Sequence, residues 1–508
     1  MLKGLLSFRD RYRILHLSWF AFFLTFVCWF NFAPFASVIE KDLALTHDQI
    51  KVLLICNLAL TIPARIIIGM LLDRFGPKIT FSALLMFAVV PCLATAMSQN
   101  FNHLVLSRLL MGIVGAGFVV GIRIVAEWFP PKEIGIAEGI YGGWGNFGAF
   151  GAEFALPSIA VATGFLAGGQ TNWRLAILLT GVITAAYGVI FYRNAQDTPP
   201  GKAYRRPKRS GAMEVTSAKS FWAMCLSNFG LIFALGLLAW RLAQPKLHFL
   251  NTAQMYVIWV LLAALFAYQT YKAYSVNREV LNGTKTYSPA QRYQFRQVAI
   301  LEFCYVVTFG SELAAVSMLP TFFEKTFALD HVVAAMIAAS YPFLNLVSRP
   351  SGGLISDKLG SRKWTMTIIA AGVGVSYLLA HSINKTWALP LAIAVTMISA
   401  YFAQAGCGST YGIVPLIKKE ITGQISGNVG AYGNFGGVVF LTIFSLTDAP
   451  TLFTTMGVAA LICSFMCAFF LKEPKHSFAA HAHDEADAPE PAREAFPSFM
   501  DGTELGKR

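Results

Sequence analysis

The sequence GMLLDRFGPK at residues 69–78 decides the fold, because the chain carries it a second time as GLISDKLGSRK at residues 353–363. Aligning the two copies matches Gly69 with Gly353 and Asp73 with Asp357. A Gly-rich, charged pattern that recurs at such a distance indicates an internal repeat of a large structural unit. The pattern also predicts a tight glycine turn at the end of a helix.

Each copy follows an apolar stretch that is long enough to cross a membrane. Of 508 residues, 56% are hydrophobic and 13% charged, and the mean hydropathy is +0.56. Soluble proteins have nearer a quarter of charged residues, and about 20 apolar residues cross a bilayer core of about 30 Å as a helix. We therefore expect an all-α membrane protein with about 14 transmembrane helices. They lie at about 16–39, 50–72, 79–97, 102–126, 133–161, 173–192, 221–240, 255–275, 297–322, 330–352, 364–382, 387–413, 424–446 and 452–471.

The repeat divides these helices into two six-helix halves. Spans 221–240 and 255–275 have no counterpart and are expected to be an inserted pair. We expect four segments: an N-terminal half (1–193), basic cytoplasmic loops with the two extra helices (194–296), a C-terminal half (297–472) and a disordered cytoplasmic tail (473–508) rich in Ala, Pro, Asp and Glu. Three histidines in the tail, His476, His481 and His483, have a spacing that favours a solvated tail over a metal site.

The net charge of +13 is concentrated in alternate loops. The N-terminus and segments 193–220 and 272–296 are basic, whereas the loops between them (40–49, 98–101, 162–172 and 383–386) hold almost no lysine or arginine. By the positive-inside rule, both termini are cytoplasmic, and the charge reports topology rather than a nucleic-acid partner. The first apolar stretch is too long for a signal peptide, so we expect a multi-pass protein of the inner (plasma) membrane.

Motifs for metal, cofactor or enzymatic chemistry are absent from the sequence. All eight cysteines fall in apolar segments and none forms a CxxC pair, so we expect no disulfide framework, no metal site and no cofactor. The chain also has no HExxH or P-loop motif, and we expect it not to be an enzyme.

Two arginines occupy equivalent positions in the halves, inside the membrane. Arg65 and Arg349 each precede the repeated aspartate by eight residues, which is about 12 Å along a helix. Neither span contains an acidic residue before that aspartate, so pairing with a buried carboxylate or snorkelling to the surface is the weaker explanation. Two permanent charges facing one cavity predict an anion site, and the planar guanidinium suits an oxyanion.

Arg123, with Glu127 one turn on, is expected to form a structural pair instead.

A second repeated motif is GGWGNFG at 142–148 and GAYGNFG at 430–436. Its glycines have the small-xxx-small spacing that lets membrane helices approach closely. The glycines leave Asn146 and Asn434 unexplained. An amide between glycines can present a donor to a cavity without adding charge.

Together these motifs carry a family resemblance. The arrangement of two parallel six-helix halves and the repeated loop are similar to the major facilitator superfamily, whose sites lie near the bilayer midplane between the halves. The stretches 117–148 and 427–437 resemble the two signature segments of its nitrate/nitrite porter family. This resemblance implies that Arg65 and Arg349 clamp the anion, and that Asn146, Asn434, Gly142 and Gly430 line its site.

The resemblance also implies an aromatic wall. Tyr305 and Phe309, four residues apart in the ninth span, match the family's tyrosine and phenylalanine, and Phe118 matches the aromatic on the opposing side. In a chain with 42 phenylalanines, core packing or lipid contact would otherwise be the ordinary explanation for each ring.

Two acidic residues are candidates for proton coupling. Glu312 lies on the same helical face as Tyr305 and Phe309. It can carry a proton, or it can simply pair locally. Glu153, seven residues after Asn146, is the second candidate.

The sequence as a whole predicts a secondary active transporter of nitrate and nitrite that works by alternating access, with nitrate uptake coupled to protons. Nitrate/nitrite antiport is the alternative within transport. A transporter-like nitrate receptor is the alternative from another class. The expected partners are nitrate, nitrite, protons and the lipid bilayer.

Overall fold

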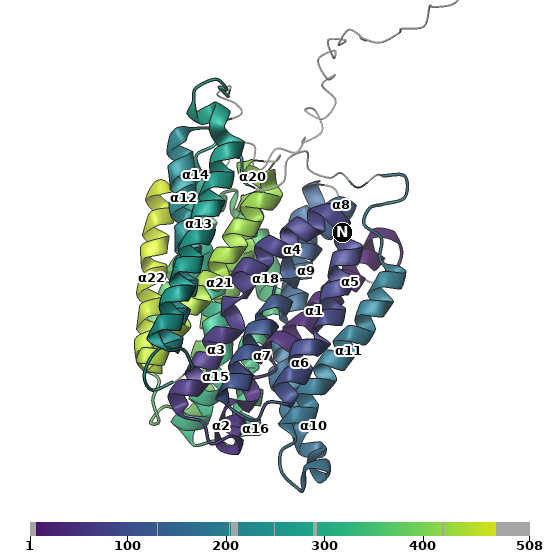
Figure 1. Ribbon diagram of the computed structural model, residues 1–508, viewed down its shortest axis with the longest axis vertical. Coiled ribbons are helices and arrows are strands. Elements are labelled where there is room, and N and C mark those ends of the chain that lie inside the picture. The colour runs from purple at the N-terminus through teal and green to yellow at the C-terminus, as the bar shows by residue number, and fades with distance from the viewer. Residues whose placement is uncertain are drawn as a thin grey trace, which may run out of the picture.

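The computed structural model describes residues 7–129, 131–202, 204, 212–247, 249–287, 292–418 and 421–473, and this part of the chain contains helices and no strand. The helices run side by side as one bundle (Figure 1). The predicted disordered tail, with its three histidines, lies outside the described residues from residue 474 onward.

The N-terminal half is built from paired helical segments. Its elements are α1 (Asp10–Phe30), η2 (Ala33–Phe35), α2 (Ala36–Asp42), α3 (His47–Ala59), α4 (Thr61–Phe75), α5 (Pro77–Phe87), α6 (Val89–Ala96), α7 (Phe101–Val114), α8 (Gly117–Trp128), α9 (Pro131–Asn146), α10 (Gly148–Ala162), η3 (Gly164–Ala167) and α11 (Trp173–Asn194).

The rest of the chain begins with the inserted pair. Its elements are α12 (Ala218–Leu242), α13 (Thr252–Leu281), α14 (Phe295–Tyr305), η4 (Val306–Gly310), α15 (Ser311–Phe327), α16 (His331–Ala338), α17 (Ser340–Phe343), α18 (Asn345–Leu359), α19 (Arg362–Ala380), α20 (Leu389–Ile417), α21 (Thr422–Leu446) and α22 (Ala449–Phe470).

Thirteen helical stretches among the described residues are long and apolar enough to cross a membrane, against the 14 expected. The difference lies at the expected span 133–161. There the chain forms α9 and α10, of 16 and 15 residues, with Phe147 between them. Backbone hydrogen bonds from Phe147 N to Gly143 O and from Gly151 N to Phe147 O carry the helix across this residue. The stretch differs from the thirteen in being less apolar, because glycines, Asn146 and Glu153 interrupt its hydrophobic residues.

The repeated loops form the glycine turns that the sequence predicts. Gly76 ends α4 with φ of 85°, and Gly360 ends α18 in the left-handed conformation with φ of 63°. Both backbones lie in the region that glycine adopts without steric cost. Pro77 then starts α5, where its missing N–H is not needed. The side chains of Asp73 and Asp357 lie outside the described part of the structure.

The ninth expected span is interrupted by a π-helical turn. Helix α14 passes into η4 (Val306–Gly310) and then into α15. Such turns are rare and are frequently found at functional sites. Here the turn places Tyr305 and Phe309 with their rings stacked, 5.0 Å between centroids.

The glycine motifs lie where helices approach most closely, as their spacing predicts. A Cβ on Gly433 would lie 2.6 Å from the rings of Tyr305 and Phe309, and one on Gly436 would lie 2.7 Å from the Val306 carbonyl. A Cβ on Gly143 would lie 2.5 Å from the carbonyl of Asn345, in the opposite half. The glycines therefore let α21 lie against η4 and let α9 lie against α18.

The inserted pair is attached to the C-terminal half through α12. Helix α12 packs on α21 and α14 and also touches α3 of the N-terminal half, while α13 packs on α12. Figure 1 shows α12 and α13 together at the outer side of the bundle. Only 6% of the membrane-spanning window of α13 is buried, which leaves its apolar surface to lipid.

Candidate functional site

The two repeated arginines are buried at the centre of the bundle. Arg65 lies in α4 and Arg349 in α18, with 1% and 4% of their surfaces exposed. Burying a charged side chain in this region is costly unless it has a partner or a function. The partners of the two arginines differ, and that difference defines the site.

Arg65 has few partners for its charge. Its Nη1 donates to the carbonyl of Gly430 on α21 at 2.6 Å. Its guanidinium lies 5.4 Å from the ring centroids of both Phe118 and Phe309. Its Nε and Nη2 are buried and have no hydrogen-bond acceptor among the described residues. Because an unmet buried donor costs about 1–3 kcal/mol, and more when charged, these two N–H groups point to an anionic ligand.

Arg349, in contrast, has a full set of partners. Its Nη2 donates to Glu312 Oε2 at 2.9 Å, and its Nε donates to Asn345 Oδ1 at 2.9 Å. Asn345 in turn donates to the other oxygen of Glu312 at 2.8 Å. With its amide oxygen facing the guanidinium, Asn146 of the N-terminal half also accepts from Arg349. Asn146 thus joins the two halves at the site.

The expectation that neither arginine has a carboxylate partner is therefore wrong for Arg349. It rested on the absence of acidic residues within the same span. Glu312 comes from α15, a different span, and the fold brings its side chain to Arg349, so neither segment alone reveals the pair. The predicted pair of Arg123 with Glu127 is confirmed, with 3.1 Å between nitrogen and oxygen.

One aromatic ring connects the two arginines. The Phe309 centroid lies 5.4 Å from the guanidinium carbon of Arg65 and 5.2 Å from that of Arg349. Tyr411, which the sequence reasoning missed, packs edge-on against both Tyr305 and Phe118. No signal in the sequence separates this tyrosine from the other rings of an aromatic-rich apolar chain.

The motif glycines lie close to the guanidinium groups. A Cβ on Gly430 would lie 3.0 Å from both Arg65 Nη1 and Tyr411 Oη. A Cβ on Gly142 would lie 3.7 Å from Arg349 Nη1. Asn434 donates to the carbonyl of Gly430 at 3.3 Å, while its Oδ1 has no partner among the described residues. The structure thus brings both glycines and both asparagines to the arginines.

Glu153 lies apart from this cluster. It is fully buried in α10, and neither of its oxygens has a hydrogen-bond partner in the described part of the chain. Seven residues separate it from Asn146, which corresponds to about 10 Å along a helix.

The site is closed toward both ends of the bundle. Its seven side chains (Arg65, Arg349, Phe118, Asn146, Tyr305, Phe309 and Asn434) are at most 4% exposed. At the end formed by the α2–α3 loop, Ser37 donates to Glu324 at 2.6 Å, and Lys51 donates to the carbonyl of Phe444 at 2.9 Å. Toward the end formed by the repeated loops, α9 packs on α18. Each of these contacts joins the two halves.

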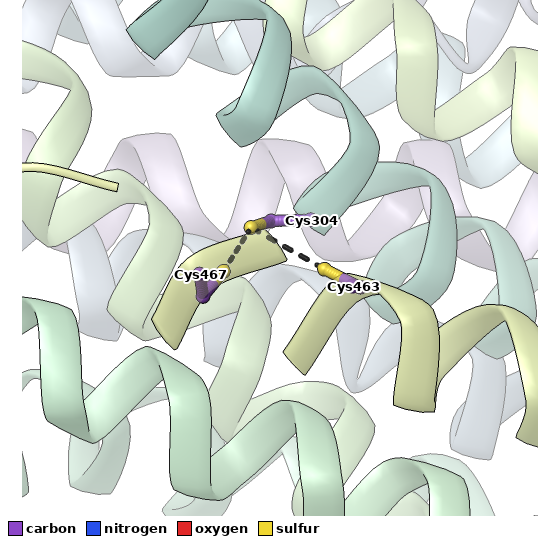
Figure 2. Close-up of side chains that lie close together, drawn as sticks. All are labelled: Cys304, Cys463 and Cys467. Carbon is purple, nitrogen blue, oxygen red and sulfur yellow. Dashed lines mark hydrogen bonds between the residues drawn. The ribbon is translucent and has the colours of Figure 1, made fainter. Parts of the chain in front are cut away.

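The structure also groups three cysteines that the sequence left unconnected. Cys304 of α14 lies 3.3 Å from Cys467 and 3.6 Å from Cys463 of α22, and all three are buried (Figure 2). Among the described residues these thiols could hold a metal ion. Three sulfur ligands suit a soft ion, whereas structural zinc takes four ligands. The group has no CxxC pattern in the sequence, because two of the cysteines are one helical turn apart and the third is on another helix.

Comparison with known proteins places these features in a family. The family model described as Major Facilitator Superfamily matches residues 18–272, 210–441 and 301–500. The chain is 76% identical over 486 residues to the nitrate/nitrite transporter NrtP of Nostoc punctiforme, covering 96% of this chain and 97% of that protein. It is 52% identical to the NrtP protein of a Picosynechococcus species, over 96% and 98% of the two chains.

More distant proteins extend the comparison. The probable nitrate/nitrite antiporter NarK1 of Thermus thermophilus is 25% identical over 87% of this chain and 86% of its own length. Among solved structures, the human organic anion transporter MFSD10 superposes with a TM-score of 0.53 at 12% identity, covering 90% of this chain and 100% of that one. That likeness concerns the fold alone.

Proposed function

The chain belongs to the nitrate/nitrite porter family of the major facilitator superfamily, and from this premise we propose that it carries nitrate and nitrite across a membrane by alternating access. The observation that carries the proposal is the buried guanidinium of Arg65, whose Nε and Nη2 have no acceptor among the described residues. The names of the relatives supply the identity of the anion, and the geometry supports it independently.

The charge of the site fits one monovalent anion. Arg65 and Arg349 bring two positive charges, and Glu312 brings one negative charge that is already paired with Arg349. One positive charge is left over, on Arg65. A single nitrate or nitrite ion neutralises it, whereas a doubly charged anion would leave an excess negative charge in a low-dielectric interior.

The shape of the site fits a flat anion. The Arg65 guanidinium lies between the rings of Phe118 and Phe309, and its free N–H groups form part of a planar fork. Tyr305 Oη is a further buried donor with no partner in the described part of the chain. A planar oxyanion can accept from the fork edge-on while aromatic faces cover it.

The closed arrangement fits a state in which the site is open to neither side. Contacts between the halves exist at both ends, so opening either end requires separating one set while the other remains. We propose that the halves rock about the arginines in this way. An anion held by Arg65, together with the contact between Asn146 and Arg349, would draw the halves together.

Two modes of coupling remain, and each has an observation in its favour. Proton-coupled uptake needs a group that gains and loses a proton, and the chain buries several carboxylates. Nitrate/nitrite exchange needs none. Exchange is favoured by the pairing of Glu312 with Arg349 and by similarity to a protein named as a probable antiporter. We propose proton-coupled nitrate uptake as the function, with exchange as the second candidate.

Membership of this transporter family also bears on which membrane holds the protein and on which side its termini lie. The described chain has thirteen candidate spans, which makes it a multi-pass membrane protein. We propose an inner (plasma) membrane location with both termini cytoplasmic, because the basic loops then lie on the cytoplasmic side.

Uptake of labelled nitrate into proteoliposomes tests the proposed function. We expect the wild-type protein to take up nitrate and nitrite and to discriminate against sulfate. The Arg65→Lys variant should fold and yet lose uptake, because an ammonium group cannot replace the bidentate guanidinium. Sulfate transport as fast as nitrate transport, or full uptake by Arg65→Lys, would refute the proposed site.

A further inference from the structure

Three buried thiols converge in the C-terminal half, outside the anion site. The sulfur atom of Cys304 in α14 lies 3.3 Å from that of Cys467 and 3.6 Å from that of Cys463, both in α22 (Figure 2). All three sulfur atoms lie within 4.8 Å of one another, and none of the three side chains is exposed. Two helices therefore bring three sulfur ligands to one point.

Hydrogen bonding gives little reason for these thiols to converge. Among the described residues, the three sulfur atoms have no hydrogen-bond partners other than one another. Other buried thiols of the chain contact hydroxyl groups instead, Cys28 that of Thr184 at 3.1 Å and Cys92 that of Thr180 at 3.5 Å. A thiol is a weak donor and a weak acceptor, so contacts among thiols alone add little to stability.

The spacing of the sulfur atoms fits a metal ion with three ligands. Metal–sulfur bonds of about 2.3 Å in a trigonal plane require sulfur atoms about 4.0 Å apart. The two separations around Cys304 are shorter than this by about half an ångström, which small side-chain rotations can supply. Cys463 and Cys467 are four residues apart, the spacing at which two side chains lie on one face of a helix.

The set of ligands favours Cu(I). Thiolates select soft ions, and Cu(I), zinc and iron–sulfur clusters are their usual partners. Structural zinc takes four ligands, and the common iron–sulfur clusters take four cysteines. Among the described residues, no histidine, aspartate or glutamate joins the three thiols as a fourth ligand. A site of three sulfur atoms therefore suits Cu(I) better than zinc or a cluster.

The thiols lie near the end of the bundle that carries the repeated loops. Cys467 is three residues, or about 4.5 Å, before the end of α22. Just beyond that end, Glu473 accepts from Ser361 of the second repeated loop at 2.8 Å. In the proposed orientation this end faces the cytoplasm, where thiols stay reduced. An exposed contact, from Gln297 to the carbonyl of Phe470 at 3.1 Å, joins α14 to α22 there, and separating it admits an ion.

A nearby cation favours the bound complex. Cu(I) with two thiolates and one thiol carries one negative charge, which is costly to bury alone. Helix α19 packs on α22, and Lys363 at the start of α19 is close enough to Cys467 for a favourable charge interaction. Lys363 therefore offsets part of the cost of burying the complex.

We propose that Cys304, Cys463 and Cys467 form a Cu(I) site that links α14 to α22. As the ion binds, copper–sulfur bonds form to all three sulfur atoms, two thiols lose their protons to water, and the third coordinates as a thiol. No electron is transferred. The proposal does not depend on anion transport. It revises the expectation of no metal site, which rested on the absence of CxxC pairs.

Competition with a coloured chelator tests the site. The purified full-length protein, reduced and kept free of oxygen, is titrated into the Cu(I) complex of bicinchoninate, and the loss of colour reports transfer of the ion. We expect the wild type to withdraw one Cu(I) per chain. Cys463→Ala, which removes one of three ligands, should lower the affinity at least tenfold. Cys225→Ala, which removes a buried cysteine of α12 outside the group, is the matched control and should bind as the wild type does.

Several results would overturn the site. They are no withdrawal of Cu(I) by the wild type, an unchanged affinity in Cys463→Ala, and an equal loss of affinity in Cys225→Ala. Tighter binding of Zn(II) than of Cu(I), measured in the same way with a zinc chelator, would overturn the identity of the ion. If Cys463→Ala fails to fold, Cys467→Ala replaces it, with the same expected loss.

The coordination of the bound ion gives a second readout. X-ray absorption at the copper edge of the loaded protein should show three sulfur atoms at about 2.3 Å from the metal. In Cys463→Ala loaded to the same level, we expect fewer sulfur neighbours. Nitrogen or oxygen atoms bound to copper in the wild type, or three sulfur neighbours retained in Cys463→Ala, would overturn the assignment.

Discussion

Arg349 donates to Glu312 over 2.9 Å, and both side chains are almost completely buried. Arg65, at the matching position of the other half, has no carboxylate partner among the described residues, and two of its donors are unmet. The two halves therefore carry the same residue at this position, but among the described residues only the arginine of the C-terminal half has a counter-charge. Four predictions follow from this asymmetry and from the packing around it.

Replacing each arginine by methionine should change stability in opposite ways. Arg349→Met leaves Glu312 buried without its cation, and breaking a buried pair in this way costs about 3–5 kcal/mol. Arg65→Met removes a buried charge that has no counter-charge, so thermal stability without nitrate should be unchanged or higher. Thermal unfolding of the purified variants measures this. Equal destabilisation by both substitutions would show that Arg65 is also paired in the empty protein.

Glu312→Gln should tighten anion binding. The substitution leaves two positive charges at the site while an amide can still accept from Asn345. If the lost carboxylate changes the binding free energy by about 1.4 kcal/mol or more, nitrate binds at least about tenfold more tightly. Slower release should then lower the transport rate. A nitrate titration of the purified variant checks this, and weaker binding would contradict the charge argument.

Gly430→Ala should weaken nitrate binding by crowding Arg65. The new methyl group would lie 3.0 Å from Arg65 Nη1 and from Tyr411 Oη, so the guanidinium must move. Gly427→Ala is the matched control in the same helix, because a Cβ there has no atom within 4 Å. We expect a loss of affinity of about tenfold or more for Gly430→Ala and none for Gly427→Ala. Equal affinities would show that Gly430 does not position the guanidinium.

Gly143→Ala should disfavour the closed state. Its Cβ would lie 2.5 Å from the carbonyl of Asn345, a backbone atom of the opposite half that cannot simply rotate away. The halves should then separate at this contact, which raises the labelling rate of a cysteine introduced there and lowers transport. Gly353→Ala, with no atom within 4 Å, is the control. Unchanged labelling and transport in Gly143→Ala would contradict closure through α9 and α18.

The sequence predicts the parts of this architecture that repeat. The duplicated loop indicates two halves, its glycines end α4 and α18 as expected, and the position of each arginine follows from its distance to the repeated aspartate. The Gly-Asn motifs indicate close helix packing, and the structure confirms it at Gly143, Gly433 and Gly436. Periodicity and spacing are local properties of the sequence, so they can be recognised in a single sequence.

Contacts between unrelated positions could not be predicted in this way. The pairing of Glu312 with Arg349, the packing of Tyr411 on Tyr305 and the grouping of Cys304 with two cysteines of α22 each join different spans. Each depends on how helices are rotated and stacked, which hydrophobicity does not encode.

The central claim is that the free charge of Arg65 binds a single monovalent anion, and a nitrate binding isotherm of the purified protein tests it most directly. For the wild type, we expect saturation at one nitrate per chain. We expect no measurable binding for Arg65→Met, which should remain folded. Wild-type affinity in folded Arg65→Met would contradict the account.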